Sequence, residues 1–296
     1  MGISIAIEGS EGAGKSLLAS ITTDLLRTTT DLSVIVTREP GGTALGEMVR
    51  GILKGEDFRG MHPMTSVFLF SAQRSELFHK VEEPFLRDNP TGVLIKDRSW
   101  LSTVALQVAE GADSGFIDTI QSPFRNIPDK FAIIDIPVLE TVVRMMAEFK
   151  YSSNREIDWR DKQTQENLVR YRDNYLAFAV ENKDKCLILD CFDDPWNKAA
   201  IIKLDMFKIL AEREGEVLPN EGQLLNTFSE GARMMVQADS EKDEQWQKYG
   251  IEARRKAVEK ARVELNYPSR EELRAKMHDE WRSLGLEGAF SGVERR

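Results

Sequence analysis

Residues 9–16 read Gly9-Ser10-Glu11-Gly12-Ala13-Gly14-Lys15-Ser16, which is a complete G-x-x-x-x-G-K-[ST] phosphate-binding motif. An apolar, strand-like run precedes it at residues 3–7, and a helix-like stretch follows at residues 17–26. The glycines let successive backbone N–H groups point at phosphate oxygens, and the N-terminus of the following helix adds a partial positive charge. We therefore predict that all eight residues bind ATP, with the Lys15 ammonium at its β- and γ-phosphates and the Ser16 hydroxyl on Mg²⁺.

Short β-rich runs alternate with longer helical patterns as far as about residue 211. The strand candidates are compact and apolar, as expected for a parallel sheet that is covered on both faces. They lie at residues 3–8, 33–37, 92–96, 131–136 and 186–190, and the helical segments lie at residues 16–26, 44–53, 64–87, 100–109, 139–149 and 164–180. This alternation predicts a three-layer α/β fold with a five-stranded parallel sheet, in a domain of residues 1–211.

Residues 212–296 contain no convincing buried strand and are rich in Glu, Lys, Arg and Gln. Residues 252–265 are typical of an exposed helix with many charges. Ser269 and Glu272 have the spacing of a capping box, which marks the start of another helix. We therefore predict a helical C-terminal extension of two or three helices, whose role the sequence does not indicate.

The composition excludes several classes of protein. The 296 residues carry a formal net charge of −9, which argues against a nucleic-acid partner. No apolar run approaches the roughly 18 residues needed to cross a bilayer, and no basic signal-peptide segment is visible at the N-terminus. Cys186 and Cys191 fit no metal motif and are expected to be reduced thiols. We expect a cytoplasmic protein with no membrane or nucleic-acid partner.

Polar motifs follow the second and third predicted strands, at the edge where parallel α/β sheets bind ligands. They are Thr37-Arg38-Glu39-Pro40-Gly41-Gly42-Thr43 and Asp97-Arg98-Ser99. Two further motifs lie on predicted helices, and they are Phe70-Ser71-Ala72-Gln73-Arg74 and Leu101-Ser102-Thr103-Val104-Ala105-Leu106-Gln107. Phe70 and Arg74 are four residues apart and so share one helix face. A phosphate loop alone does not separate kinases from ATPases, so these motifs decide the class.

In this combined order the chain resembles the thymidylate kinases, the P-loop enzymes that phosphorylate dTMP to dTDP with ATP. The resemblance covers about residues 3–210 and rests on I-E-G-x-E-G-A-G-K, T-R-E-P-G-G-T, F-x-A-x-R, D-R and L-S-T-x-x-x-Q at family spacing. It implies a P-loop kinase fold, ATP and dTMP as the bound nucleotides, Mg²⁺ as the cofactor and a homodimer.

The resemblance implies that four side chains bind the acceptor base. Phe70 would stack on the pyrimidine, and Arg74 would donate to the base O4, an acceptor that cytosine lacks. Thr103 matches the residue that bonds the base N3, and Gln107 lies one helical turn further along. From the residues alone, Phe70 also fits core packing and Arg74 also fits a solvated helix surface.

The resemblance also implies roles around the acceptor phosphate. Arg98 would contact that phosphate, and Asp97 would lie near the metal and its waters. Glu11 has the position of the family carboxylate near the acceptor sugar and phosphate, and Arg38 would close the acceptor pocket. The alternative for Asp97 and Arg98 is a salt bridge at the end of the strand.

A lid is expected at about residues 144–160, where related enzymes carry many arginines. Gly12 stands where some family members have a basic residue, and members without that residue take the catalytic arginine from the lid. Arg144, Arg155 and Arg160 are the candidates, with Arg144 and Arg155 preferred. The alternative for each of them is a solvated, charged loop. The expected catalytic residues are Lys15, Arg98, Arg144 and Arg155.

Two departures from the family pattern leave the acceptor open. Leu106 stands where many relatives have a tyrosine near the sugar 2′ position, and Ser99 replaces an aromatic residue. A pocket changed in this way could admit a 5-substituted dUMP or another deoxynucleoside monophosphate. Two alternatives of other classes are a non-catalytic nucleotide-binding module and a P-loop ATPase motor. The intact Lys15 and Ser16 argue against the former, and the acceptor motifs have no role in the latter.

Overall fold

The computed structural model describes residues 1–58, 60–124, 128–151, 165–216, 218, 221–240 and 251–286, without the side chains of residues 151, 231–240, 252 and 253. Its centre is a sheet of five strands in the order β2-β3-β1-β4-β5, and every neighbouring pair is parallel. The strands are β1 (Ile3–Glu8), β2 (Val34–Arg38), β3 (Val93–Asp97), β4 (Lys130–Asp135) and β5 (Cys186–Asp190). The predicted parallel sheet is confirmed, and each predicted strand end lies within one residue of the observed one.

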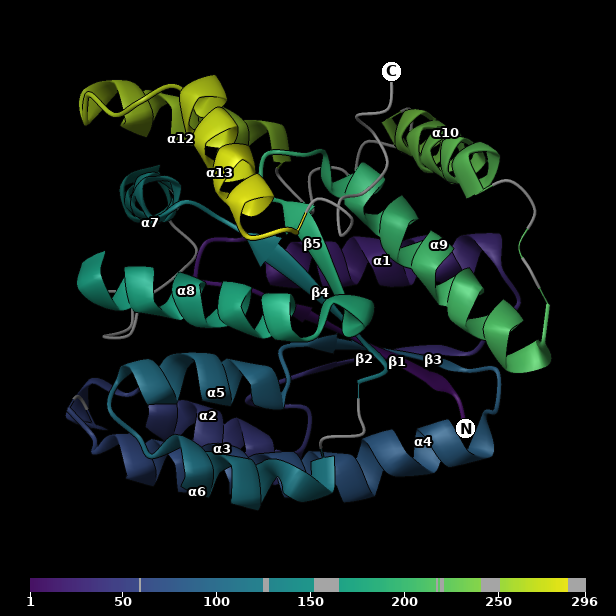
Figure 1. Ribbon diagram of the computed structural model, residues 1–296, viewed down its shortest axis with the longest axis horizontal. Coiled ribbons are helices and arrows are strands. Elements are labelled where there is room, and N and C mark those ends of the chain that lie inside the picture. Colours follow the sequence, from purple (N-terminus) through teal and green to yellow (C-terminus); the bar gives the residue numbers. More distant parts are fainter. Residues whose placement is uncertain are drawn as a thin grey trace.

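Helices cover both faces of this sheet (Figure 1). On one face, α1 (Lys15–Thr29) packs on β1, β2 and β3, and α9 (Pro195–Glu214) packs on α1 and β1. On the other face, α8 (Gln165–Glu181) packs on β4 and β5, and α5 (Trp100–Ala109) packs on α8. Beyond α5 lie α2 (Ala44–Lys54), α3 (Pro63–Leu77) and α6 (Ser114–Gln121). The α/β three-layer prediction is therefore confirmed.

One predicted helix is interrupted. The segment predicted as a single helix over residues 64–87 forms α3, a π-helical turn at Phe78–Glu82 and α4 (Glu83–Asp88). The physical reason is Pro84, which has no amide hydrogen and so cannot donate to the carbonyl of Lys80 four residues earlier. The wide turn places the fully buried Glu82 against the ammonium of Lys96 on β3.

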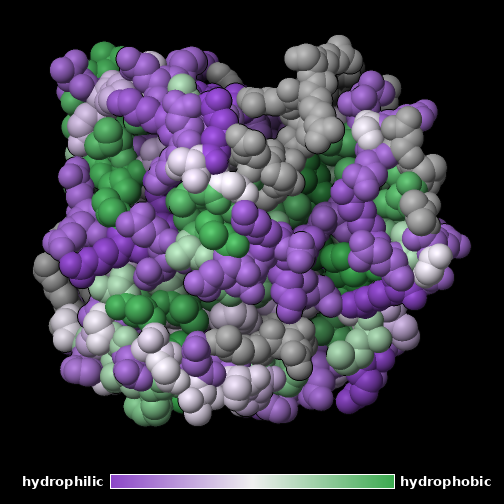
Figure 2. Space-filling view, in the orientation of Figure 1, coloured by the Kyte–Doolittle hydropathy of each residue, from purple (hydrophilic) through white to green (hydrophobic). Residues whose placement is uncertain are grey.

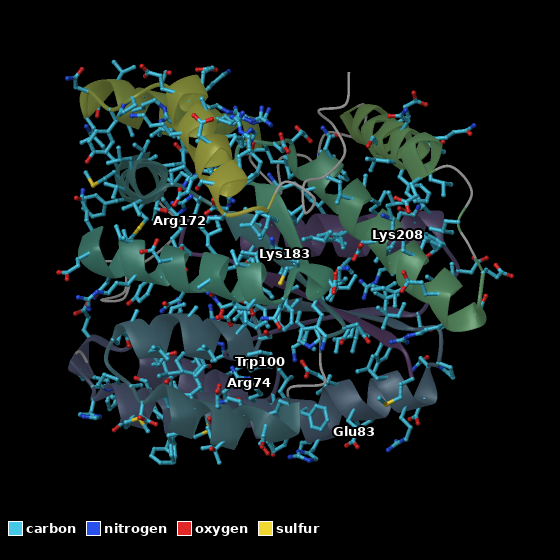
Figure 3. The ribbon with its side chains drawn as sticks, in the orientation of Figure 1. Arg74, Glu83, Trp100, Arg172, Lys183 and Lys208 are labelled. Carbon is cyan, nitrogen blue, oxygen red and sulfur yellow. The ribbon has the colours of Figure 1, made fainter. Side chains whose placement is uncertain are left out.

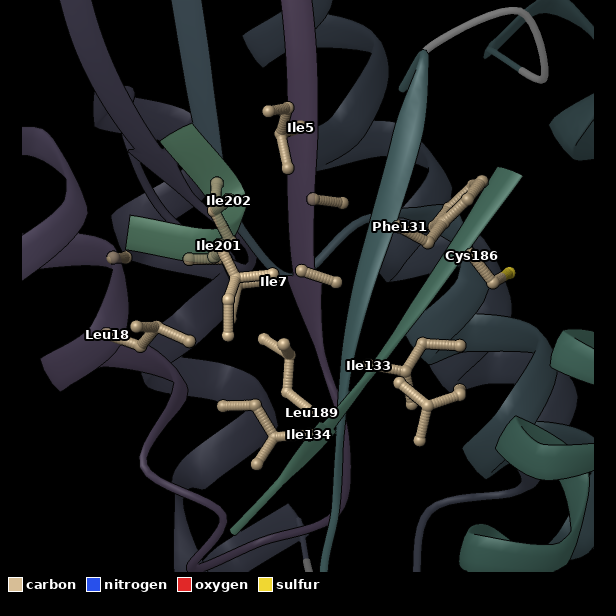
Figure 4. Close-up of a cluster of buried hydrophobic side chains, with 14 of the residues drawn as sticks. Ile5, Ile7, Leu18, Phe131, Ile133, Ile134, Cys186, Leu189, Ile201 and Ile202 are labelled. Carbon is tan, nitrogen blue, oxygen red and sulfur yellow. The ribbon is translucent and has the colours of Figure 1, made fainter. Parts of the chain in front are cut away.

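The core lies on both faces of the sheet. β1 is buried along its whole length, and Ile5 and Ile7 have no exposed surface. Successive side chains of a strand point to opposite faces. Figure 4 shows this in β4, where Phe131 and Ile133 lie on one side of the sheet and Ile134 lies on the other. This packing fixes the carboxyl ends of the strands, from which the polar motifs extend.

The C-terminal extension is helical, as predicted, and packs on the rest of the chain. α10 (Glu221–Ser240) lies against α9, and α12 (Ile251–Glu264) lies against α7 (Val138–Tyr151). α13 (Arg270–Ser283) begins with the predicted capping box and lies over the ends of β4 and β5 (Figure 1). Its Trp281 is fully buried in the same hydrophobic cluster as the sheet. The division of the chain at residue 211 stays a prediction.

Hydrophilic side chains cover most of the surface over α12 and α13, and hydrophobic residues form separate patches on this face (Figure 2). Within the described residues, no helix combines the length and apolar character that a membrane span requires. Cys186 and Cys191 are buried free thiols, as predicted.

Candidate active site

The phosphate loop joins β1 to α1, and its backbone has the conformation for which its glycines are suited. The φ angle is +134° at Gly9, +72° at Gly12 and +92° at Gly14, a region that residues with a Cβ rarely adopt. A Cβ on Gly9 would also lie 2.5 Å from the carbonyl oxygen of Ile134 on β4. Gly14 is the N-cap of α1, so the N-terminus of this helix faces the loop. The loop can therefore direct its N–H groups at a phosphate.

Lys15 is buried at the base of this loop. Its Nζ donates to the Ser10 carbonyl oxygen at 2.7 Å and lies 3.7 Å from a Glu11 carboxylate oxygen. Burial and the nearby Arg98 guanidinium lower the pKa of Lys15 to about 8, although Glu11 opposes the shift. A phosphate placed on the loop would favour the charged form of this ammonium.

Ser16 and Asp97, the two predicted metal residues, lie together. Ser16 Oγ donates to Asp97 Oδ2 at 2.5 Å, although the residues are 81 positions apart in the sequence. Hydroxyl and carboxylate oxygens are ligand atoms that Mg²⁺ prefers. The donor set therefore fits a magnesium ion at the end of the phosphate loop.

Arg98 has a left-handed backbone conformation, which residues other than glycine rarely adopt. Its φ is +75°, and its N–H donates to the Ile7 carbonyl oxygen at 3.1 Å. Its guanidinium pairs with Glu11 and donates to Ser102 Oγ at 3.2 Å. A left-handed conformation outside glycine is costly and is often found at functional sites. The structure thus places Arg98 beside the phosphate loop through an ion pair with Glu11, and its contact with the acceptor phosphate stays a prediction.

Glu8 at the end of β1 organises this region, and sequence reasoning missed it. It is fully buried, and it accepts hydrogen bonds from the backbone N–H of Ser99 at 2.7 Å and from Ser102 Oγ at 2.6 Å. The Tyr175 hydroxyl donates to it at 3.2 Å. Burial raises the pKa of Glu8 against the opposing effect of these serine bonds. In the sequence Glu8 is the acidic residue of the I-E-G motif at the end of an apolar strand, and nothing in that motif indicates its partners.

Arg74 and Thr103, two predicted base-binding residues, are in direct contact. Arg74 Nη2 donates to Thr103 Oγ1 at 3.0 Å, and Figure 3 shows Arg74 between α3 and α5. The guanidinium also donates to Glu39 Oε2 at 2.7 Å and to Gln121 Oε1 at 2.7 Å. Arg74 is 2% exposed. It is therefore neither a solvated helix residue nor free to rotate, and its orientation is fixed before a ligand binds.

Sequence reasoning also missed the buried charge network behind Arg74. Lys96 Nζ donates to the Glu82 carboxylate at 2.5 Å and lies 3.4 Å from a Glu39 oxygen. Burial alone would raise the pKa of Glu39, but Arg74 and Lys96 lower it below its usual value. Thr37 Oγ1 donates to Glu82 at 2.9 Å. The buried charges of Arg74, Glu39, Lys96 and Glu82 are thus paired with one another, and these pairs hold the side chains on the acceptor side of the site in place.

A cavity of about 500 Å³ connects these groups. Every predicted site residue lines it except Gly9 and Ala13 of the loop and Arg144, while Arg155 and Arg160 lie outside the described residues. Most of the predicted lid, from residue 152 onward, also lies outside them. Sequence reasoning missed six polar residues that line the same cavity, which are Arg50, Lys54, Glu110, Glu148, Tyr171 and Arg254.

The remaining predicted substrate residues, Arg38, Phe70 and Gln107, also line this cavity. Arg38 is exposed and pairs with Glu47 on α2 at 2.9 Å. Gln107 Nε2 donates to Glu110 at 3.3 Å, and Phe70 contributes a ring to the cavity lining. Leu106, which departs from the family pattern, also lines the cavity.

Arg144 lies against the phosphate loop and does not line the cavity. It donates to the Gly12 carbonyl oxygen at 3.2 Å, to the Cys191 carbonyl oxygen at 3.1 Å and to Glu140 at 2.7 Å. In this arrangement the guanidinium fixes the loop backbone. Its catalytic role, like that of Arg155, stays a prediction.

Comparisons with known proteins agree with this geometry. The family model described as thymidylate kinase matches residues 7–193. The chain is 34% identical to a thymidylate kinase of Chlamydia felis over 63% of this chain and 88% of that protein. It is 35% identical to one of Anaplasma phagocytophilum over 64% of this chain and 82% of that protein. The crystal structure of a thymidylate kinase from Ehrlichia chaffeensis covers 71% of this chain and 98% of its own, with a TM-score of 0.52 and 25% identity. The chain belongs to the thymidylate kinase family.

Proposed function

We propose that this protein transfers the γ-phosphoryl group of ATP to dTMP, giving ADP and dTDP. The observation that supports it best is that the phosphate loop and the Arg74–Thr103 pair line one cavity. A donor site and an acceptor site are thus within reach of each other. The names of the relatives support dTMP as the acceptor.

At the donor end, the loop N–H groups and Lys15 would bind the β- and γ-phosphates. Ser16 and Asp97 would hold Mg²⁺, which when bound neutralises phosphate charge. Phosphoryl transfer needs little covalent chemistry from a protein, so positioning and charge stabilisation account for most of the catalysis. The buried Lys15 is suited to this role because its charge acts in surroundings that exclude water.

At the acceptor end, Arg98 would exchange part of its contact with Glu11 for the dTMP phosphate. An oxygen of that phosphate attacks the γ-phosphorus in line. The bond from this phosphorus to the β,γ-bridging oxygen breaks, and ADP leaves with the electron pair. The acceptor phosphate is largely ionised near neutrality, so no strong general base is required.

An acceptor panel tests the substrate. We expect kcat/KM for dTMP to exceed that for dCMP by at least about a hundredfold, because cytosine would leave the buried Arg74 facing a donor in place of O4. Loss of the 5-methyl group in dUMP should cost about tenfold, as for one methyl group in an apolar pocket. The measurement is ADP release in a coupled assay with ATP and each nucleotide.

Two outcomes would contradict the proposal. A preference for a 5-substituted dUMP or for another deoxynucleoside monophosphate would keep the reaction and change the acceptor. Binding of ATP without turnover of any acceptor would favour the non-catalytic module.

We also propose that the protein is a homodimer that pairs through α2 and α3. Leu45 and Met48 on α2 are 41% and 69% exposed, and Phe68 on α3 is 53% exposed. Exposed apolar side chains on adjacent helices are typical of interaction surfaces. M48E should reduce the mass measured by light scattering from that of a dimer to that of a monomer. V263E on α12, at a still more exposed position, should leave the dimer intact, and a wild-type monomer would contradict the proposal.

A further inference from the structure

The position of α12 is fixed by charged contacts with the kinase core. Arg262 is 4% exposed, and its guanidinium pairs with Glu140 on α7 and donates to the Pro268 carbonyl oxygen at 3.1 Å. At the far end of α7, Lys150 pairs with Glu264 at 2.5 Å. Apolar side chains of the two helices also pack together, Val143 and Ala147 from α7 against Ala257, Val258 and Ala261 from α12. α12 is therefore held along α7 over several turns.

α7 in turn lies against the phosphate loop. Its Arg144 donates to the Gly12 carbonyl oxygen at 3.2 Å. A Cβ on Gly12 would lie 3.6 Å from Arg144 Cβ and 3.8 Å from the Thr141 carbonyl oxygen. The helix on which α12 packs is therefore in contact with the donor end of the site.

Arg254 of α12 lines the cavity that contains the phosphate loop, as does Glu148 of α7. Three other cations that line this cavity already have partners, since Lys15 and Arg98 pair with Glu11, and Arg74 pairs with Glu39. Arg254 differs from them, because it is exposed and pairs with no other residue in the described part of the chain. The next residue, Arg255, points instead to Asp194 at 3.0 Å.

We infer that Arg254 binds the phosphates of ATP, so that the C-terminal extension supplies a cation to the donor site. An unpaired guanidinium at the wall of a phosphate-binding cavity offers charge-assisted and bidentate hydrogen bonds to phosphate oxygens. Arg254 lies on a helix that packs on α7, and α7 itself contacts Gly12 of the phosphate loop, which favours the donor phosphates over the acceptor as its ligand. The inference rests on the proposed function, because it takes the cavity as a nucleotide site.

Binding of ATP in the absence of any acceptor tests the inference. Titration calorimetry with Mg²⁺–ATP on the full chain would compare the wild type with R254A, R254K and K256A. K256A is the matched control, because Lys256 is an exposed cation on the same helix that does not line the cavity. R254A should weaken ATP binding by about tenfold, the effect of losing one charge-assisted hydrogen bond. R254K should weaken it less, and K256A by less than about twofold.

The outcomes separate this inference from the proposed function. Equal ATP affinities of R254A and K256A, with the wild type binding ATP, would overturn the role of Arg254 alone. Failure of the wild type to bind ATP would overturn both proposals. A tenfold loss in R254A with an unchanged affinity for dTMP would support a donor-side contact, whereas a loss confined to dTMP would overturn it.

Discussion

Replacing Lys15 with methionine should lower kcat/KM by about a thousandfold, the upper end of the range for removing one pre-organised electrostatic donor. Methionine is close to lysine in length and fits a buried position, so the loop should keep its shape. The variant loses the cation that would face the β- and γ-phosphates. A coupled assay of ADP release measures the effect. K80M is the control, because Lys80 is exposed, does not line the cavity and pairs with the neighbouring Glu76 at 2.5 Å.

The pH dependence of the wild type provides a second measurement on the same ammonium. The pKa of Lys15 is lowered to about 8 by burial and by Arg98, so Lys15 is charged below that pH and becomes neutral above it. We expect kcat/KM for ATP to fall as pH rises through about 8. Bound phosphates favour the ammonium, so the fall in kcat should occur at higher pH. K15M with more than a tenth of wild-type activity would contradict both expectations.

The sheet was predictable because its signals are local. Each strand is a short apolar run, and the glycines of the phosphate loop occur where positive φ is required. The break in the helix predicted over residues 64–87 was not predicted, since proline is also tolerated in the first turn of a helix. The π-helical turn at this break places Glu82 against Lys96, and no sequence pattern within residues 64–87 indicates that contact.

The candidate site was predictable where a motif assigns a residue its role, and not where that role depends on partners distant in the sequence. Arg74 and Thr103 belong to motifs, and the structure brings them together. Glu8 and Glu39 also stand in the quoted motifs, but no role was predicted for them. Glu8 bonds residues more than 90 positions away, and Glu39 bonds Arg74 35 positions away. A carboxylate at the end of a strand has many possible roles, and only its partners select one.

The C-terminal extension is the clearest case in which contacts between distant residues could not be predicted from the sequence. Its helices were predicted from charge pattern and from the capping box at Ser269. Their contacts with the kinase core were not predicted, because many of them are made by charged residues that also suit a solvated helix and by apolar residues whose partners lie far away in the sequence. Trp281 Nε1 donates to Asp135 at 2.6 Å, and Arg172 of α8 pairs with both Asp135 and Glu280. In Figure 3, Arg172 lies between α8 and α13. Such contacts attach the extension to the ends of β4 and β5.

Replacing Arg262 with methionine should therefore destabilise the whole protein and not the extension alone. Arg262 and Glu140 are 4% and 1% exposed, and removing one partner of a buried ion pair leaves the other charge uncompensated. Arg144 still donates to Glu140 at 2.7 Å, so we expect the lower end of the usual range, about 3 kcal/mol. Urea unfolding followed by circular dichroism measures this loss.

Two further variants make the Arg262 measurement specific. R255A removes an exposed pair with Asp194 and should cost less than about 1 kcal/mol. E140Q combined with R262M should recover part of the stability, because the amide has no charge to leave unpaired. Two separate transitions, with only the first shifted by R262M, would show that the extension unfolds independently of the sheet. A single transition that shifts as a whole is expected, since Leu273, Met277 and Trp281 share one hydrophobic cluster with β1 and β4.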